Sequence, residues 1–334
     1  MNTIKDQNKI LIVSKSNNVV IKSISQWLLN SKFELVKLNY DTDKFLIISL
    51  NIDHSTFKFK INDTEYDYLD FKNIYFHCGA IQLKDFTGIV SSSDNIIDFS
   101  SAFAYYRTAY EYFLQETFSN LIHQKNTIGK NQGGVINKLN VLNIAQKSGM
   151  RIPQTIVTTR KEDVSNFINI HSKIISKSLD LNFIFYDKNR SKLIHGLTSE
   201  IILADLEELP ADFPLSMFQE NIEKIFEIRI YFLGSKNFAS AIFSQNSNNT
   251  IQDYRNYDDD FPNRVVPFIL SEKFENKLLK FKELTGLKTG SIDVMVDAQN
   301  NYYFLEVNPQ GQFMGISEYC NYYLEKHLAN YLQE

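Results

Sequence analysis

The chain has 334 residues, of which 43% are apolar and 22% are charged, and its formal net charge is -4. This length suits two or three packed subdomains better than one small core. The small negative charge gives no electrostatic reason to expect nucleic-acid binding. The first residues are polar, and no window offers the roughly 20 apolar residues of a transmembrane helix. We therefore expect a cytoplasmic protein without a membrane segment.

The first 125 residues are expected to form a small α/β domain. Short β-branched runs predict buried strands, and a helix is expected after the first strand, at about 20–30. A longer helix with a buried stripe of Tyr and Phe is expected at about 99–120. The expected strands are 9–14, 45–49, 56–61 and 73–77.

The rest of the chain divides at a polar, glycine-containing segment, 129–134, which predicts a linker. A helix is expected from Lys138 to Gly149, because glycine suits the position after a helix end. The last third combines a helix at 271–285 with several β segments, at 228–233, 240–243, 290–296 and 302–307. We expect an α/β fold in three parts: 1–125, 126–215 and 216–334.

Two β segments near the end of the chain carry oxygen-bearing side chains within apolar runs. A polar turn at 298–301 joins them, and the resulting hairpin places Asp293 opposite Glu306 or Asn308. Glu306 and Asn308 are two residues apart, so they share one face of their strand. An unpaired buried carboxylate is costly, whereas carboxylate and amide oxygens are preferred ligands of magnesium. The pattern predicts a magnesium site, against the alternative of a hairpin with exposed polar residues.

A second candidate site lies between Met217 and Tyr231. An extended linker carrying Gln219, Glu220 and Ile222 would offer backbone groups to the edge of an adenine ring. Glu227 would accept hydrogen bonds from ribose hydroxyls. Arg229, on the same strand face, would bind phosphate or carboxylate. The alternative is an ion-paired surface strand.

Four further residues are candidates for binding or catalysis. Lys177 follows a β-branched run and Lys138 opens a helix, so either ammonium group could bind phosphate. Asp253 and Arg255 lie in a polar loop, where Arg255 could stabilise charge on a transferred phosphoryl group. The alternatives are solvated lysines and an ordinary charged loop. The sequence has no P-loop, Rossmann or nucleophile-elbow motif, and its six histidines show no paired metal spacing.

Taken in order, these segments resemble the ATP-grasp superfamily over roughly 137–334. The resemblance implies an ATP-grasp fold of the α/β (α+β) class, with ATP between a central lid and a C-terminal domain. It also implies binding of ATP and two Mg2+ ions. The matching residues are Lys138, Gly149 to Pro153, Lys177, Gln219 to Ile222, Glu227, Arg229, Asp293, Glu306 and Asn308.

Within the superfamily, the chain resembles the graspetide synthetases, which include microviridin-type macrocyclases and the maturases that accompany SPASM proteins. The family's loop is usually Asp-Trp-Arg, and Tyr254 replaces the tryptophan here. Residues 1–125 match the family only in general layout. The segments that carry this resemblance are Gln219-Glu220, Glu227 to Arg229, Asp253 to Arg255 and 306–312.

This resemblance implies a macrocyclase that acts on a ribosomally made precursor peptide, which docks through its leader. A core Asp or Glu side chain would be activated as an acyl phosphate and captured by a Ser or Thr hydroxyl, giving an ω-ester, or by Lys, giving an amide. Arg229 and Arg255 would hold carboxylate and phosphoryl group in line, and Asp253 is the candidate base. A homodimer is implied by the family alone. The alternatives are a glutamate-ligase-like amide ligase acting on a small molecule or protein tail, and a nucleotide-binding scaffold.

Overall fold

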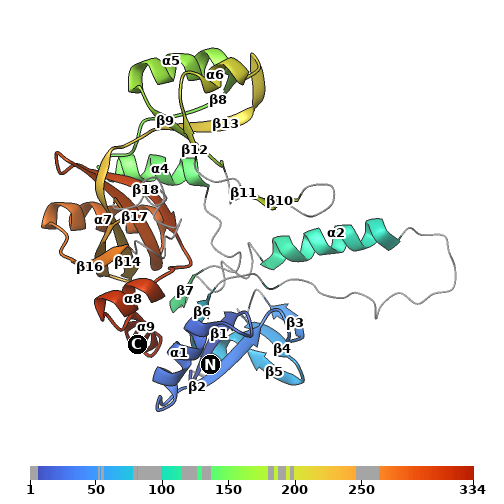
Figure 1. Cartoon of the computed structure of the whole chain (residues 1–334). Helices are drawn as coiled ribbons and strands as arrows, with labels where there is room; N and C mark the ends of the chain where they lie inside the picture. The colour runs from blue at the N-terminus through green and yellow to red at the C-terminus, as the bar shows by residue number, and fades with distance from the viewer. Residues whose placement is uncertain are drawn as a thin grey trace. The chain divides into compact units, whose positions relative to one another are not determined.

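The computed structural model describes residues 7–51, 53, 56–77, 81, 99–114, 126–129, 137–179, 184–186, 193–195, 199–245 and 263–334. The chain forms two compact units: unit 1 is Met1–Gly134 with Tyr323–Glu334, and unit 2 is Val135–Tyr322 (Figure 1). No helix in these described ranges is long and apolar enough to cross a membrane. The expected three-part division at 125 and 215 stays a prediction.

Unit 1 is built on a parallel sheet, and the buried strand predicted at 9–14 lies inside it. The strand order is β2 (Glu34–Asn39), β1 (Lys9–Ser14), β6 (Phe71–Phe76), β7 (Asn126–Ile128). A second, antiparallel sheet is formed by β3 (Phe45–Asn51), β4 (Thr56–Ile61) and β5 (Thr64–Asp67), with η1 (Tyr68–Asp70) after it. Leu11 and Val13 of β1 share one core with Phe57 and Phe59 of β4, so the alternate residues of both strands join the sheets.

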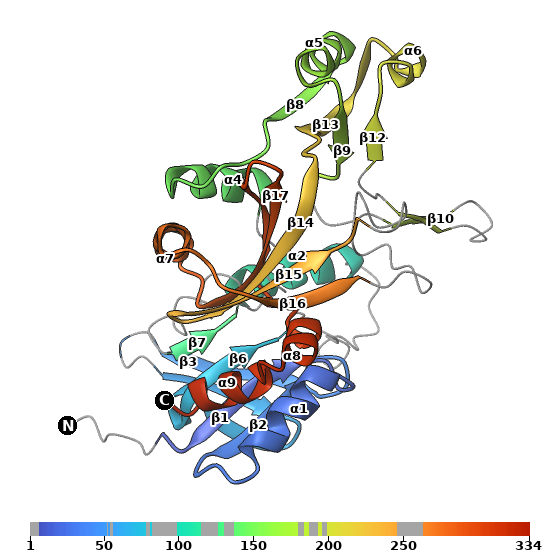
Figure 2. The ribbon, with the colours of Figure 1, turned by 60° about the vertical axis from the view of Figure 1, so that its left-hand side comes forward.

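Two helices from opposite ends of the chain pack together in unit 1. They are α1 (Val19–Leu28) and α9 (Leu324–Tyr331), which lie side by side (Figure 2). The Lys326 ammonium lies 5.0 Å from the centroid of the Trp27 ring. Nδ2 of Asn73, in the central sheet, donates to the carbonyl of Leu332 at 2.7 Å. The last helix is therefore an integral part of unit 1 rather than of the unit that precedes it.

Helix α2 (Phe99–Tyr112) corrects the expected stripe of buried aromatic residues. Tyr105, Tyr106 and Tyr112 are exposed. Among the aromatic residues of this segment whose burial is described, Tyr110 and the following Phe113 pack against the core of unit 1. The aromatic spacing predicted the helix, but three of its four tyrosines face solvent.

The first part of unit 2 is a four-stranded sheet covered on one face by two helices. Its strand order is β12 (Ser199–Ile201), β9 (Ile174–Lys177), β13 (Asp212–Glu220), β8 (Thr155–Arg160). The helices are α5 (Lys161–His171) and α6 (Asp205–Glu208), and β10 (Ile184–Tyr186) pairs separately with β11 (Leu193–His195). Val164 and Phe167 of α5 pack on Phe218 of β13. We call this four-stranded sheet the lid sheet.

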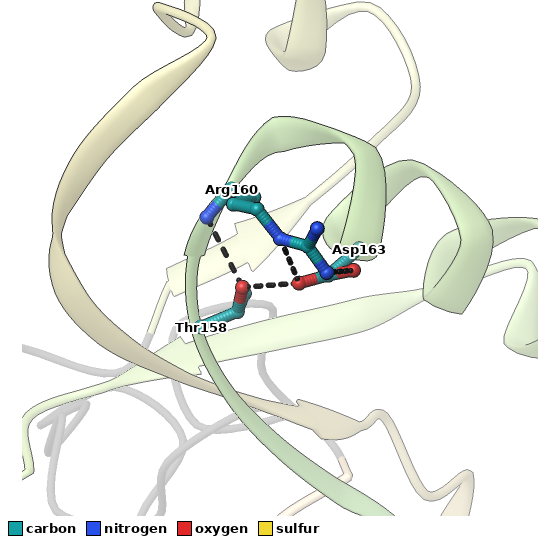
Figure 3. Close-up of polar contacts among 3 residues, drawn as sticks. All are labelled: Thr158, Arg160 and Asp163. Atoms are coloured by element: carbon teal, nitrogen blue, oxygen red, sulfur yellow. Dashed lines mark hydrogen bonds and ion pairs between the residues drawn. The ribbon is translucent and has the colours of Figure 1, made fainter.

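Strand β8 passes into α5 without a loop, and a small polar network stabilises this corner (Figure 3). The Asp163 carboxylate accepts from Oγ1 of Thr158 at 2.6 Å and from Nη2 of Arg160 at 2.7 Å. The backbone N–H of Arg160 donates to Oγ1 of Thr158 at 3.0 Å. Because α5 has no side-chain N-cap, these contacts and the acidic first turn stabilise the start of the helix.

The second part of unit 2 is a five-stranded antiparallel sheet, which we call the catalytic sheet because it carries the residues that the sequence resemblance implies for catalysis and metal binding. Its order is β16 (Arg264–Phe268), β15 (Lys236–Phe243), β14 (Lys224–Leu233), β17 (Thr289–Asp297), β18 (Tyr302–Asn308). Helices α4 (Lys138–Lys147) and α7 (Glu272–Thr285) share a hydrophobic core with one face, and α8 (Met314–Cys320) follows β18. The predicted hairpin at 298–301 and the predicted end of α4 before Gly149 are both confirmed.

His77, directly after β6, yields a testable pH dependence. Its ring is buried, Nδ1 lies 2.6 Å from the Tyr75 hydroxyl, and burial lowers its pKa from 6.5 to about 4. Between these two values the unfolded chain binds a proton that the folded chain does not bind. The free energy of unfolding should therefore fall by up to about 3 kcal/mol as the pH falls through this window.

Urea unfolding near pH 7 and near pH 4.5, for the wild type and for His77→Gln, measures how far the free energy of unfolding falls between these pH values. The fall should be smaller in the variant, which lacks the contribution of His77 and keeps that of the carboxylates. An equal fall in the two proteins would show that His77 does not cause the pH dependence.

Candidate functional site

The face of the catalytic sheet opposite α4 and α7 carries a row of charged residues. Arg229 of β14 pairs with Asp293 of β17, and Asp293 pairs in turn with Glu306 of β18. Residues directly opposite one another in antiparallel strands project from the same face. The row therefore brings one guanidinium and two carboxylates together from three strands. The predicted hairpin register, with Asp293 opposite Glu306, is confirmed.

An irregularity in β18 decides on which face Glu306 lies. Val294 pairs with Phe304, whereas the preceding Asp293 pairs with Glu306, so Leu305 is an extra residue in the ladder. In a regular ladder Leu305 would oppose Asp293, and Glu306 would oppose Ile292, whose side chain is fully buried in the core. Because side chains alternate with a period of two, the bulge moves Glu306 to the face of Asp293.

The Arg229 side chain is anchored from two directions. Nη1 lies 3.6 Å from Oδ1 of Asp293, and Nη2 donates to Oε1 of Gln312 at 3.3 Å. The Gln312 carbonyl in turn accepts from Oγ of Ser291 at 3.2 Å. The Arg229 and Asp293 side chains remain 11% and 13% exposed, so the pair is accessible from solvent. Gln312 belongs to the site, whereas sequence analysis named it only as part of the segment 306–312.

Asn308, the third predicted metal ligand, lies on the same face as Glu306. It pairs with Ser291, two residues before Asp293. Its Oδ1 accepts from the backbone N–H of Gln310 at 3.0 Å, which orients the carboxamide and leaves the oxygen a second lone pair. The described residues contain no cluster of three or more His, Cys, Asp or Glu side chains that could hold a metal ion. The predicted set has two carboxylates and one amide, and its metal binding stays a prediction.

Glu227 shares the face of Arg229 as expected, but it is buried and forms an ion pair with Lys224. A bulge between Lys224 and Phe226 places the two partners on one face although they are three residues apart. The expected alternative of an ion-paired surface strand is thus right about pairing and wrong about exposure. The role of Glu227 toward a ribose stays a prediction, and Lys224 is a neighbour that the sequence analysis missed.

The expected extended linker is shorter than the sequence suggests. Gln219 and Glu220 belong to β13, and the backbone of this strand pairs with β8 and β9 on both sides. The connection to the catalytic sheet contains Asn221, Ile222 and Glu223. The misassignment has a physical cause, because a strand in the middle of a sheet gains its stability from neighbours that are distant in sequence.

The side chain of Gln219 is almost fully buried. Its Nε2 donates to Oγ1 of Thr155 at 2.9 Å. Its Oε1 has no hydrogen-bond partner within the described ranges. A buried acceptor in this state is costly unless a further donor meets it.

The structure brings the two candidate lysines together. Nζ of Lys138, at the start of α4, donates to the carbonyl of Ser178 at 3.1 Å, directly after Lys177 at the end of β9. Lys177 pairs with Met217, so it projects from the same face of the lid sheet as Gln219, opposite α5. One cation and a buried amide oxygen therefore belong to this face, and a second cation lies at the end of β9. Asp253 and Arg255 lie outside the described residues.

The turn that carries Gln312 requires glycine at position 311. Gly311 has a φ of +63°, and a Cβ built on it would lie 2.8 Å from Cε2 of Tyr231. The Tyr231 ring is fully buried, with its centroid 4.7 Å from that of Phe313, and cannot easily move away. Gly311→Ala should lower the free energy of unfolding by about 1–3 kcal/mol.

Thermal and denaturant unfolding of Gly311→Ala measure the effect. Gly315→Ala is the matched control, because a Cβ there meets Tyr319 at an ordinary 3.9 Å and its φ lies in the usual range. A loss of stability that is the same in both variants would rule out a special requirement at 311.

No protein-family model and no curated protein matches the sequence. Solved structures do match. An ATP-grasp ligase from Chryseobacterium gregarium, described as RiPP-associated and solved with ADP and a leader and core peptide, is 23% identical with a TM-score of 0.77, covering 98% of this chain and 95% of that one. Macrocyclase MdnC from Microcystis aeruginosa MRC, bound with precursor peptide MdnA, is 21% identical with a TM-score of 0.74, covering 97% and 98%.

A third structure, the ATP-grasp ligase PsnB with a phosphomimetic variant of minimal precursor, Mg and ADP, is 16% identical with a TM-score of 0.66, covering 97% of each chain. The likeness extends over nearly the whole chain, including the first 125 residues. It shows that this chain has the ATP-grasp fold, of mixed α/β class, as the sequence resemblance implies.

Proposed function

We propose that this chain is an ATP-dependent peptide ligase that closes rings in a precursor peptide. It joins a core Asp or Glu side chain to a Ser or Thr hydroxyl and releases ADP and phosphate. The observation that carries the proposal is the row of Arg229, Asp293 and Glu306 on the open face of an ATP-grasp sheet. The similar structures solved with ADP, with a leader and core peptide, and with a precursor peptide support this substrate class.

The oxygen donors on the catalytic sheet fit a hard divalent cation. Asp293, Glu306 and Asn308 present two carboxylates and an amide oxygen on one face, a donor set suited to magnesium. We assign two Mg2+ ions to them, and bound magnesium would neutralise the phosphate oxygens of ATP. Lys138 and Lys177 would bind the same phosphates from the lid side.

The nucleoside end of ATP is assigned to the connection between the two sheets and its flanks. Gln219, Glu220 and Ile222 would bind adenine, and Glu227 would accept from the ribose. The buried Oε1 of Gln219, which has no hydrogen-bond partner among the described residues, favours this assignment, because an adenine amino group is a donor of the kind that it requires. Glu227 is held in place by Lys224.

The reaction has two steps. A carboxylate oxygen of the peptide attacks the γ-phosphorus of ATP, and the bond between this phosphorus and the oxygen that bridges it to the β-phosphate breaks. ADP is released, and the peptide carries an acyl phosphate. A peptide hydroxyl then attacks the acyl carbon, its proton passes to a base, and phosphate leaves, so one water is removed for each ester. Arg229 would hold the carboxylate, Arg255 would stabilise the phosphoryl group, and Asp253 is the candidate base. A Lys side chain would give an amide by the same route.

Mass spectrometry separates this activity from its alternatives. The protein is incubated with ATP, Mg2+ and a Thr- and Glu-rich peptide, and ring closure should lower the peptide mass by one water per ring while ADP accumulates. An amide ligase of the glutamate-ligase type would add whole amino acids, and a nucleotide-binding scaffold would release no ADP with any acceptor. Either of these results would overturn the proposal. A homodimer in the cytoplasm remains part of it.

Glu306→Gln should lower the rate of ring formation by about 100- to 1,000-fold, because the substitution keeps the size of the side chain and removes its charge. Product formation is followed by mass spectrometry and folding by circular dichroism. Glu318→Gln, at an exposed position of α8, is the matched control and should retain full activity. Normal turnover by Glu306→Gln would remove this residue from the mechanism.

Lys177→Ala should weaken ATP binding about 10- to 100-fold, since it removes a charge-assisted contact to phosphate. Calorimetric titration with ATP and Mg2+ measures the Kd. Lys173→Ala, an exposed position just before the same strand, should bind ATP as the wild type does. If the two variants have the same affinity, the assigned role of Lys177 is wrong.

A further inference from the structure

A cavity of about 290 Å³ lies at the start of α7, beside the turn between β17 and β18. It is separate from the polar face of the catalytic sheet, because the Phe274 ring packs on Tyr302 at this end of the hydrophobic core. Its lining combines cationic, amide, hydroxyl and aromatic side chains: Arg151, Lys273, Lys277, Asn300, Asn301, Ser271, Phe274 and Tyr302. We call it the basic pocket.

The fold brings the three cations of the basic pocket together from two segments. Lys273 and Lys277 are four residues apart on α7 and so share one helix face. A Cβ built on Gly149 would lie 3.8 Å from Cε of Lys277, so the lysine stem passes over the glycine that ends α4. Two residues later, the Arg151 carbonyl accepts from the backbone N–H of Phe304 at 2.8 Å, which fixes Arg151 beside β18.

The three positive charges repel one another, and the acids described around them form no direct ion pair with them. Burial lowers the pKa of Lys277, and the charges of Lys273 and Arg151 lower it further. Within the described ranges, no carboxylate forms an ion pair with any of the three. The Asp297 carboxylate at the same turn accepts from the N–H groups of Gln299 and Asn301, from the Asn301 side chain and from Tyr303, which is also hydrogen-bonded to Arg151.

Like charges four residues apart destabilise a helix, so this arrangement costs free energy in the absence of a partner. It stands out in a chain whose formal net charge is -4. Cations, carboxamides and a hydroxyl around one cavity are donors, and they suit a ligand that carries oxyanions.

We propose that the basic pocket binds Asp or Glu side chains of the peptide substrate outside the reacting residue. This inference rests on the proposed function, which requires a peptide with several carboxylates. The amides of Asn300 and Asn301 can pair with a peptide backbone, and Tyr302 offers an apolar wall to side-chain stems. Tyr302 pairs with Val296, whereas Glu306 pairs with Asp293, so the two residues lie about 10 Å apart along the edge strand β18 and on its opposite faces. A peptide that passes round this edge reaches both.

Fluorescence anisotropy with a short fluorescein-labelled peptide of alternating Thr and Glu tests the pocket without turnover. The double variant Lys273→Gln, Lys277→Gln should bind the peptide about fivefold more weakly than the wild type, and added salt should reduce the difference. Lys280→Gln, an exposed lysine of the same helix that does not line the pocket, is the matched control and should bind like the wild type. A peptide with Gln in place of Glu should bind the wild type at least as weakly as the acidic peptide binds the double variant, because it also loses the carboxylate assigned to Arg229.

Equal affinity of the wild type and the double variant for the acidic peptide would overturn the inference. Displacement of that peptide by an equal concentration of inorganic phosphate would also overturn it, in favour of a small-oxyanion site. Ring formation separates this inference from the proposed function. Wild-type turnover with an unchanged KM in the double variant refutes only the pocket, whereas an absence of ADP and rings with the wild type refutes the function itself. The supporting result is a raised KM for peptide at an unchanged kcat.

Discussion

The alternation of side chains between the two faces of β18 decides whether Glu306 lies beside Asp293 on the polar face of the catalytic sheet. Its apolar residues, Phe304 and Val307, face the core shared with α4 and α7, and a strictly regular strand would send Glu306 to that side. A carboxylate among buried aliphatic side chains without a partner would cost several kcal/mol. The single extra residue Leu305 removes this conflict, because it shifts the pairing by one position and leaves both the core contacts and the acidic pair in place.

Two acids on this sheet, Glu227 and Asp293, each have a cation beside them. Lys224 accompanies Glu227, and Arg229 accompanies Asp293. All four residues belong to neighbouring strands whose other face is apolar. Such pairing lets carboxylates occupy a poorly solvated surface, since removing one partner of a buried pair is far more costly than removing both. The sheet thus separates its two tasks, packing on one face and charge on the other.

Local patterns predicted those elements that depend on nearby residues. The hairpin around Asp293 and Glu306 has a polar turn between two apolar runs, and α4 has both an N-cap and a terminal glycine. Their residue types alone carried these predictions. The ordered set of segments also carried the resemblance to the ATP-grasp fold, which the structure shares with its solved neighbours.

The features that sequence reasoning missed depend on contacts between distant segments. Strand β13 was expected to be partly a linker, because its pairing with β8 and β9 is not encoded in its own residues. The ion pair of Lys224 with Glu227 requires a bulge that no spacing rule predicts. The meeting of Lys138 with the end of β9 spans the whole of β8 and α5.

The position of α9 in unit 1 has a consequence for synthesis on the ribosome. Leu324 and Leu328 of α9 are fully buried there, beside α1, and the Leu332 carbonyl completes a hydrogen bond with the central sheet. Translation produces these residues only after the whole of unit 2. Part of the hydrophobic surface of unit 1 therefore stays exposed while nearly two hundred further residues are synthesised. Unit 2 can thus complete its folding before unit 1, although it is synthesised later.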